Sequence, residues 1–233
     1  MKIAIMQPYL FPYIGYFQLI NAVDKFIIHD DVQYIKGGWI NRNRILLGAK
    51  DYMFTFSLKK SSSFDLINNR QFSSKINDDK EKILRIIEYA YSKAPFYKDA
   101  VIVLKETFKN NIENVNHFIY TSIVKVCEYL DIRAEIIMAS SISKDESLKG
   151  QQRVIELCKR IGANHYINPI GGIELYSKKE FELHDIQLNF LESKLIKYNQ
   201  FDNDFVPNLS IIDVMMFNSK EDIRLKLKEY SLV

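Results

Sequence analysis

The start of the chain constrains the fold most strongly, because it places a turn and a helix between two short apolar strands. Lys2 to Met6 predicts one strand, Phe17 to Ala22 a helix, and Lys25 to His29 a second strand. A helix between two strands is typical of a parallel sheet, since it carries the chain back to begin the next strand in the same direction. We therefore expect an α/β fold with a mostly parallel, Rossmann-like sheet flanked by helices.

The rest of the chain continues this alternation with two interruptions. A β-hairpin is predicted at Ile45–Leu47 and Tyr52–Leu58, and three successive helices at about 78–131, which we interpret as a helical insert. Further strands are predicted at Ala134–Met138, His165–Asn168 and Leu188–Leu191, with a helix at Ser147–Ile161 that Gly162 ends. The sequence thus predicts a single α/β domain over residues 1–233.

The last part of the sequence predicts two short helices, Ser210–Phe217 and Glu221–Tyr230. Ser210 is a good N-cap residue, and Asp213 stands three positions later, where a capping box places its second member. We therefore expect Asp213 to support the start of a helix rather than catalysis.

Composition excludes several classes of protein. The net charge is only +3 and the basic residues are spread along the helices, unlike the concentrated patch of a nucleic-acid-binding protein. No apolar run approaches the ~20 residues of a membrane span, and no signal peptide is visible. Cys127 and Cys158 lie on apolar faces of predicted helices, without the histidine spacing of a zinc site. We expect a cytoplasmic protein with buried cysteines, no metal site, no transmembrane segment and no nucleic-acid partner.

Polar segments follow the first two predicted strands, and open α/β sheets bind ligands outside the carboxyl ends of their strands. The first segment is an aromatic turn before a helix, whose free backbone amides favour an anion such as phosphate. It is neither a Walker loop nor a dinucleotide fingerprint. The candidate ligand-binding residues of this turn are Gln7, Tyr9, Tyr13, Gly15 and Tyr16.

The second segment begins with His29, Asp30 and Asp31, which are the candidate catalytic residues. Paired carboxylates at the end of a strand can act as a general base, hold Mg²⁺ or accept hydrogen bonds from a sugar or an amine. The alternative is structural, with one carboxylate capping the strand and a salt bridge to Lys36 or Arg42.

The loop after these carboxylates is dense in polar and aromatic side chains. Arg42 and Arg44 alternate with asparagines, so in an extended strand they share a face that can clamp a carboxylate or a diphosphate, or simply form a surface ladder. Two later glycines follow a strand, where the backbone can approach a ligand closely or only form a turn. The candidate substrate-binding residues here are Gln33, Tyr34, Lys36, Trp39, Asn41, Arg42, Asn43, Arg44, Gly171 and Gly172.

Three stretches strongly resemble the signature blocks of the WbqC-like proteins: MQPYLFPYIGYFQLINAVDKFIIHDDVQYIKGGWINRNRIL, NPIGGIELY and LSIIDVMMFNS. The resemblance runs from residue 2 to about 219, and the helical middle is its least distinctive part. It implies a role in O-antigen and other surface-polysaccharide biosynthesis. The implied activity is that of a transferase, which places an acyl or aminoacyl group such as glycine on the amine of a nucleotide-linked amino sugar.

The opening layout is also similar to that of the nucleotidyltransferase-like α/β fold, which includes pantothenate synthetase. In that superfamily a His-x-Gly-His turn holds the nucleotide phosphates, and Tyr13 and Tyr16 stand at the two histidine places here. Tyrosine is neutral at pH 7 and cannot supply the positive charge of a protonated imidazole. This departure argues against ATP-dependent adenylation and leaves nucleotide binding as an expectation.

The resemblance implies a nucleotide-sugar or another small-molecule substrate. A nucleotide with Mg²⁺, either ATP or the nucleotide of a sugar-nucleotide, is the candidate cofactor, and a homodimer is a candidate assembly. Two other functions stay open: a non-catalytic sugar-nucleotide or glycan-binding subunit that serves a glycosyltransferase, and an ATP-dependent carboxylate-activating ligase or nucleotidyltransferase.

Overall fold

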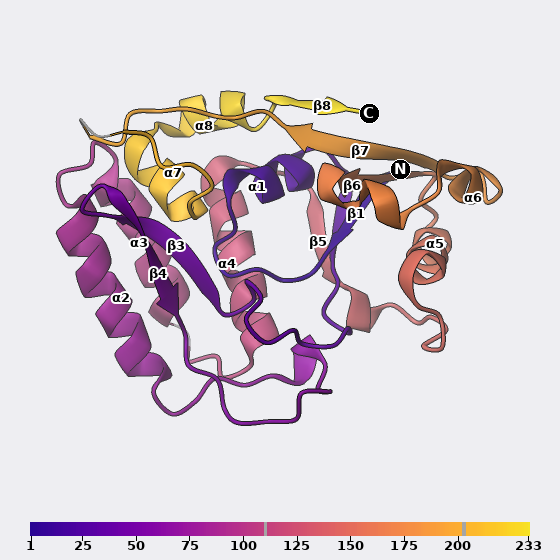
Figure 1. Ribbon diagram of the computed structural model, residues 1–233, viewed down its shortest axis with the longest axis horizontal. Helices are drawn as coiled ribbons and strands as arrows, with labels where there is room; N and C mark the ends of the chain where they lie inside the picture. Colours follow the sequence, from indigo (N-terminus) through magenta and orange to yellow (C-terminus); the bar gives the residue numbers. More distant parts are fainter. Residues whose placement is uncertain (110, 202–203) are drawn as a thin grey trace.

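A six-stranded sheet in the order β5-β2-β1-β6-β7-β8 forms the centre of the protein (Figure 1), in a computed structural model that describes residues 1–109, 111–201 and 204–233. All neighbouring strands are parallel except β8, which pairs antiparallel with β7. The prediction of a mostly parallel α/β sheet is confirmed. The strands are β1 (Lys2–Met6), β2 (Lys25–Ile28), β5 (Glu135–Met138), β6 (His165–Pro169), β7 (Gln187–Ser193) and β8 (Tyr230–Leu232).

The order of the parallel strands is that of a doubly wound sheet. The chain moves outward from β1 through β2 to β5, and then returns to the other side of β1 to form β6 and β7. The reversal therefore lies between β1 and β6. The loops after these two strands, which begin at Gln7 and Ile170, flank the crevice where doubly wound sheets bind ligands.

Helices cover both faces of the sheet, and strand side chains alternate between the two faces because successive residues of a strand point in opposite directions. Ala4 and Phe26 pack in the core that contains α1 and α4, whereas Ile3 and Ile27 pack in the core that contains α5. The α-helices are α1 (Ile14–Asn21), α2 (Ile76–Tyr91), α3 (Tyr97–Lys109), α4 (Val115–Leu130), α5 (Gly150–Arg160), α6 (Lys178–Glu182), α7 (Ile211–Phe217) and α8 (Lys220–Lys226), and the 3₁₀ segments are η1 (Ile67–Asn69), η2 (Ala139–Ser141) and η3 (Ile170–Leu175).

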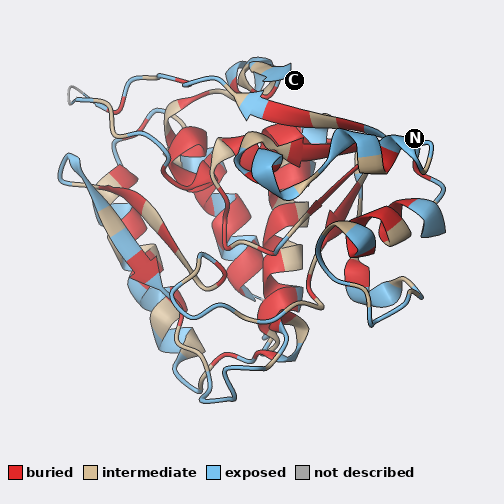
Figure 2. Cartoon of the chain, turned by 45° about the vertical axis from the view of Figure 1, so that its right-hand side comes forward, coloured by how far each residue is buried: buried red, intermediate tan, exposed pale blue. Residues whose placement is uncertain are grey.

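The predicted hairpin is a separate two-stranded sheet of β3 (Arg42–Leu47) and β4 (Lys50–Thr55). Its two turn residues, Gly48 and Ala49, have φ angles of 58° and 63°. Two left-handed residues in succession form the type I′ turn, whose twist matches that of the hairpin strands. Apolar residues of the hairpin and of α2, α3 and α4 belong to the same core as one face of the main sheet. Figure 2 shows this buried core between α4 and the strands, with the loops at the lower end exposed.

The prediction for the end of the sequence is partly wrong. The last helix, α8, ends at Lys226, and Tyr230 begins a further strand where the helix was predicted to continue. β8 has only three residues, too few for a periodic pattern, and pairing with β7 decides its conformation. The last strand is therefore β8 and not Leu188–Leu191.

Ser210 caps α7 as predicted, because its hydroxyl accepts a hydrogen bond from the backbone amide of Ile212 at 3.2 Å. Asp213 is not part of a capping box. Its buried carboxylate instead accepts hydrogen bonds from the Tyr91 and Tyr198 hydroxyls, at 2.7 and 2.6 Å. Asp213 therefore joins α7 to α2 and to the segment after β7.

Candidate anion-binding site

Asp30 is fully buried just beyond β2, and hydrogen bonds occupy both oxygens of its carboxylate. Oδ1 accepts a bond from the backbone amide of Ser140 at 2.9 Å, and Oδ2 accepts bonds from the Ser140 hydroxyl at 2.6 Å and the Asn116 amide at 2.8 Å. Ser140 lies in η2 after β5, and Asn116 lies in α4. The carboxylate thus holds two neighbouring strand ends against a helix, which favours the structural alternative for Asp30.

Asp31 lies in a cluster of nearly buried charges. Its Oδ2 atom is 2.5 Å from Lys144 Nζ and 2.8 Å from Arg153 Nη2, and both cations also pair with the exposed Glu146. Burial acts to raise the pKa of Asp31, but the hydrogen bond and charge of Lys144 and the charge of Arg153 outweigh it and lower the pKa overall. Asp31 therefore forms salt bridges, but the partners predicted for the structural alternative, Lys36 or Arg42, are wrong: the partners are Lys144 and Arg153.

Of the three predicted catalytic residues, His29 has the fewest side-chain interactions with its surroundings. Its Nε2 atom lies 3.6 Å from Asp31 Oδ1 and has no hydrogen-bond partner among the residues that the structure describes. Burial lowers the pKa of His29, and the nearby Asp31 carboxylate only partly offsets this effect. The imidazole is therefore neutral at pH 7, which is the form that can accept a proton.

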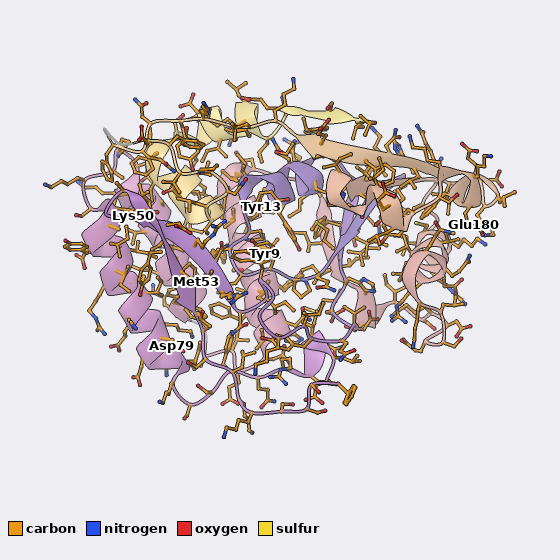
Figure 3. The ribbon with its side chains drawn as sticks, viewed as in Figure 1. Tyr9, Tyr13, Lys50, Met53, Asp79 and Glu180 are labelled. Carbon is orange, nitrogen blue, oxygen red and sulfur yellow. The ribbon has the colours of Figure 1, made fainter. Side chains whose placement is uncertain are left out.

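The aromatic turn and the arginines of β3 meet around Trp39. Tyr9 stacks on Trp39 with 5.8 Å between ring centroids, and Tyr13 lies 6.2 Å from Tyr9 (Figure 3). The guanidinium carbons of Arg42 and Arg44 lie 5.6 and 5.3 Å from the centre of the Trp39 ring, within range of a cation–π interaction. The two arginines therefore share one face of β3, as their alternation with asparagine predicts.

Tyr16 and Gly15 are parts of the scaffold rather than an open surface. Tyr16 is fully buried, and its hydroxyl donates a hydrogen bond to the Gln7 carbonyl at 3.1 Å. The Tyr13 ring covers Gly15 so closely that a Cβ atom there would collide with it. Of the two tyrosines at the histidine places, only Tyr13 remains partly exposed.

Asn43 is also buried and has a structural position. Its amide donates hydrogen bonds to the carbonyls of Leu10 and Phe11, at 2.8 and 2.5 Å. Phe11 has a φ angle of 42°, in the left-handed region that non-glycine residues rarely adopt. Asn43 therefore fixes an unusual backbone conformation in the turn after β1.

Of the two glycines after β6, Gly172 is needed for close packing. A Cβ atom on Gly172 would collide with the Asn168 amide, which donates a hydrogen bond to the Pro169 carbonyl at 3.0 Å. The Asn168 oxygen in turn accepts a bond from the Tyr166 hydroxyl at 2.8 Å. Gly171 faces open space. Gly172 is thus required for close packing, whereas Gly171 remains free for a ligand-binding role.

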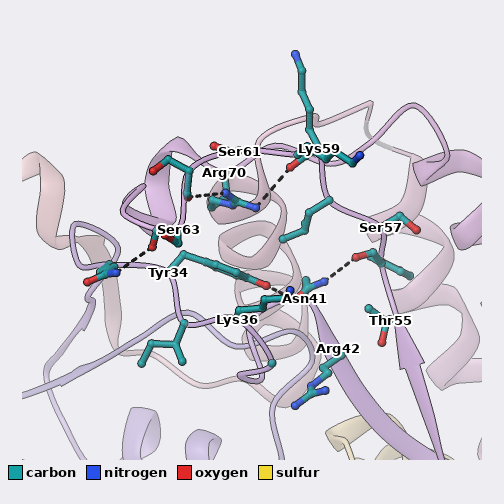
Figure 4. Close-up of a pocket in the computed structure, with 17 residues that line it drawn as sticks. Tyr34, Lys36, Asn41, Arg42, Thr55, Ser57, Lys59, Ser61, Ser63 and Arg70 are labelled. Carbon is teal, nitrogen blue, oxygen red and sulfur yellow. Dashed lines mark hydrogen bonds between the residues drawn. The ribbon is translucent and has the colours of Figure 1, made fainter.

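A pocket of about 920 Å³ opens between the loop after β2 and the loop after β4 (Figure 4). We call it the cationic pocket. One wall brings together five of the predicted substrate-binding residues: Gln33, Tyr34, Lys36, Asn41 and Arg42. The other wall was not predicted from the sequence, and its polar residues are Thr55, Ser57, Lys59, Lys60, Ser61, Ser62, Ser63 and Arg70. The only signal for this wall was the run Lys59-Lys-Ser-Ser-Ser63, which has no acidic residue.

Hydrogen bonds inside the walls fix the shape of the pocket. The Tyr34 hydroxyl donates to Asn41 Oδ1 at 2.9 Å, and the Asn41 amide donates to a backbone carbonyl just beyond β4 at 2.8 Å. The Arg70 guanidinium lies 4.6 Å from the centre of the Tyr34 ring and donates to the carbonyls of Ser62 and Lys59 at 3.3 and 3.4 Å. Asn41 and Arg70 therefore position the walls.

The lining carries only one sign of charge. Lys36, Arg42, Lys59, Lys60 and Arg70 line the pocket, and no aspartate or glutamate does. Lys59 points away from the cavity in Figure 4, and Arg70 pairs with Asp65 at 3.7 Å. Lys36, Arg42 and Lys60 have no ion-pair partner in the described part of the chain. A cleft lined by cations concentrates anions, and guanidinium groups bind phosphate oxygens in a bidentate manner. The pocket therefore suits a ligand with several negative charges.

Within residues 1–109, 111–201 and 204–233, no three His, Cys, Asp or Glu side chains come together to hold a metal ion. Both cysteines are free and buried, as predicted. No helix in the described ranges has the length and apolar character needed to cross a bilayer.

The fold and the pocket define an α/β protein with a doubly wound sheet and a cation-lined cleft between the loops after β2 and β4. The chain belongs to the WbqC-like protein family, whose model matches residues 7–225. It is also 29% identical over 223 residues to the uncharacterized protein Rv1507c of Mycobacterium tuberculosis (strain ATCC 25618 / H37Rv), and the match covers 93% of each chain. No solved structure matches, so the similarity to the nucleotidyltransferase-like fold stays a prediction.

Proposed function

We propose that this protein binds a nucleotide-linked amino sugar in the cationic pocket. The observation that supports this proposal best is that Lys36, Arg42 and Lys60, which have no ion-pair partner in the described residues, line one cavity that no carboxylate lines. The diphosphate of a nucleotide-linked sugar carries the complementary charge, and the hydroxyls of Ser57 and Ser61 to Ser63 are potential donors to the sugar or the phosphates. The proposed setting is surface-polysaccharide biosynthesis, as expected for the WbqC-like family.

The proposed reaction is transfer of an acyl or aminoacyl group, such as glycine, to the sugar amine. In such a transfer the amine nitrogen attacks the acyl carbonyl carbon, and the bond from that carbon to the leaving group of the donor breaks. The proton that the amine loses passes through a base to the leaving group. Of the three predicted catalytic residues, His29 is the candidate base, because its imidazole is neutral at pH 7 and its Nε2 atom has no hydrogen-bond partner in the described residues. His29 does not itself line the cationic pocket.

A second candidate is a non-catalytic subunit that binds a sugar-nucleotide for a glycosyltransferase. The bonding of the two aspartates favours it, because hydrogen bonds occupy the Asp30 carboxylate and two cations occupy that of Asp31. A third candidate, ATP-dependent carboxylate activation, is less favoured because the buried Tyr16 hydroxyl is bonded to the backbone and cannot reach a nucleotide phosphate.

Calorimetric titration with dTDP-, UDP- and GDP-linked amino sugars, each with and without Mg²⁺, tests the binding step. Arg42→Ala is the informative variant, and Arg44→Ala is its matched control. Both arginines contact Trp39, but only Arg42 lines the pocket, whereas Arg44 pairs with Asp51 at 3.1 Å. We expect Arg42→Ala to weaken binding roughly tenfold or more and Arg44→Ala to leave it nearly unchanged. Equal losses, or no binding of any nucleotide-sugar, would contradict the assignment of the pocket.

Mass spectrometry of the bound sugar separates the candidate functions. A gain in sugar mass equal to the acyl or aminoacyl group, when an activated donor is added, supports the transferase. Tight binding with no mass gain for any donor supports the binding subunit, and release of pyrophosphate from ATP with an amino acid supports carboxylate activation.

A further inference from the structure

Large apolar side chains are exposed on the two loops that form the cationic pocket. Phe64 is 80% exposed and Ile35 is 58% exposed, and Trp39 and Leu66 are exposed as well. Single exposed apolar residues are ordinary, but a group of them beside a pocket marks an interaction surface. These four residues form what we call the apolar rim.

Hydrogen bonds hold the two loops of the rim side by side. The Gln33 side chain donates to the Ser63 carbonyl at 2.9 Å, and the backbone amide of Tyr34 donates to the Asp65 carbonyl at 2.9 Å. Ile35 follows Tyr34, and Phe64 lies between Ser63 and Asp65. The segments that carry Ile35 and Phe64 are therefore held side by side.

Positive charge surrounds the apolar rim. Lys36 is next to Ile35, and Lys59 and Lys60 precede Phe64. Asp65 lies between Phe64 and Leu66, and its carboxylate pairs with Arg70 at 3.7 Å. All three lysines are exposed. Protruding aromatic and aliphatic side chains among lysines have the composition of a surface that lies in the interface of an anionic bilayer. Neither a neutral apolar partner nor a basic partner would match this pattern.

The position of the surface on the molecule agrees with such contact. Figure 1 shows the loops after β2 and β4 together at the lower end of the view, away from both termini. Ile35 lines the cationic pocket, and Phe64 directly follows the lining residue Ser63. We infer that the apolar rim and its lysines dock the protein on an anionic lipid bilayer, with the cationic pocket beside the headgroups. The inference extends the proposed function but does not require it, because docking is independent of what the pocket binds.

Sedimentation with large unilamellar vesicles tests the inference. One set contains phosphatidylglycerol and phosphatidylcholine, and the other contains phosphatidylcholine alone. We expect the protein to bind the anionic vesicles, to bind neutral vesicles much less, and to dissociate at high salt because surface charge is screened. Phe64→Ala should weaken binding roughly tenfold through lost apolar burial. The double variant Lys59→Ala/Lys60→Ala should weaken it on the order of 25-fold.

Matched controls are present elsewhere on the surface. Tyr89 in α2 is 81% exposed, and Lys178 and Lys179 are consecutive exposed lysines in α6. Tyr89→Ala and Lys178→Ala/Lys179→Ala should therefore leave vesicle binding unchanged. Equal losses in the control variants, or no binding of anionic vesicles by the unmodified protein, would overturn the inference. Self-association that Phe64→Ala abolishes, without vesicle binding, would show that a second copy covers the rim.

Two variants separate this inference from the proposed function. Phe64 does not line the pocket, so Phe64→Ala should lower vesicle binding and leave nucleotide-sugar affinity unchanged. Arg42→Ala should lower nucleotide-sugar affinity and leave vesicle binding unchanged. If the unmodified protein bound no anionic vesicles, only the docking surface would be refuted. If it bound no nucleotide-sugar, only the pocket assignment would be refuted.

Discussion

The side-chain amide of Asn116 donates a hydrogen bond to the Asp30 carboxylate at 2.8 Å, across 86 positions of the sequence. Both residues are fully buried. An asparagine at position 30 would direct an amide donor at groups that are themselves donors. We expect Asp30→Asn to lower the free energy of unfolding by about 3 kcal/mol, measured by urea denaturation, because charged hydrogen bonds are lost and buried donors are left unpaired.

Asp51→Asn is the control for this variant, because Asp51 is an exposed carboxylate with one surface partner, Arg44. Asp51→Asn should lower the free energy of unfolding by less than about 1 kcal/mol. If Asp30→Asn instead kept full stability and lost transferase activity, Asp30 would be a catalytic residue as first predicted.

The stability of the protein should decrease as pH falls below neutrality, in part because of His29. Its folded-state pKa is lowered by burial, so below the unfolded value of about 6.5 the unfolded chain binds more protons and stability falls. Burial also lowers the pKa of His165. We expect His29→Gln to remove part of the loss between about pH 7.5 and 5.5, measured from urea unfolding at each pH.

The double variant His29→Gln/His165→Gln should remove more of the pH dependence than either single change. An undiminished loss of stability in His29→Gln would show that its imidazole is solvated in the folded protein.

The two adjacent glycines of η3 should respond differently to the same substitution. Gly172→Ala places a methyl group against the hydrogen-bonded Asn168 side chain, whereas Gly171→Ala adds one in open space. We expect Gly172→Ala to destabilise the protein by about 1–3 kcal/mol through overpacking, and Gly171→Ala to be nearly neutral. Thermal unfolding of the two variants measures the difference, and equal melting temperatures would contradict this packing role.

The two tyrosines that donate hydrogen bonds to Asp213 should contribute differently to stability. The Tyr91 hydroxyl donates to Asp213 Oδ1 and accepts from the Leu46 backbone amide, each at 2.7 Å, whereas the oxygen bonded by Tyr198 is also bonded by Gln200. We expect Tyr91→Phe to lower the free energy of unfolding by about 3 kcal/mol, because two buried groups lose a hydrogen-bond partner. Tyr198→Phe should lower it by about 1 kcal/mol. Chemical denaturation measures both values, and the opposite order would show that the Tyr91 hydroxyl is dispensable.

Local patterns were sufficient to predict most of the fold. Apolar runs such as Lys2–Met6 identify buried strands, and the apolar stripe that includes Ile83 and Ile87 identifies α2, because both depend on neighbouring residues alone. β8 was missed because its three residues become a strand only by pairing with β7. The rule that predicts local structure therefore fails where a distant partner decides the conformation.

The same limit applies to the site. The sequence shows that Asp30 follows a strand. Its hydrogen bonds could not be predicted, because its partners Asn116 and Ser140 lie 86 and 110 positions away. The polar run from Lys59 to Ser63 had no periodicity from which to infer a wall of the pocket. Only the fold brings it beside Tyr34 and Arg42.

The left-handed turn at Phe11 has a consequence for the order in which the protein can mature. The Phe11 carbonyl accepts hydrogen bonds from the Asn43 amide and from the Ser210 hydroxyl, at 2.5 and 2.7 Å. The backbone amide of Ile211 donates to the Pro12 carbonyl at 2.8 Å. A turn that emerges early from the ribosome therefore receives its last bonds only after residues 210–211 have been synthesised. The turn after β1 should stay open to chaperones and proteases until that moment.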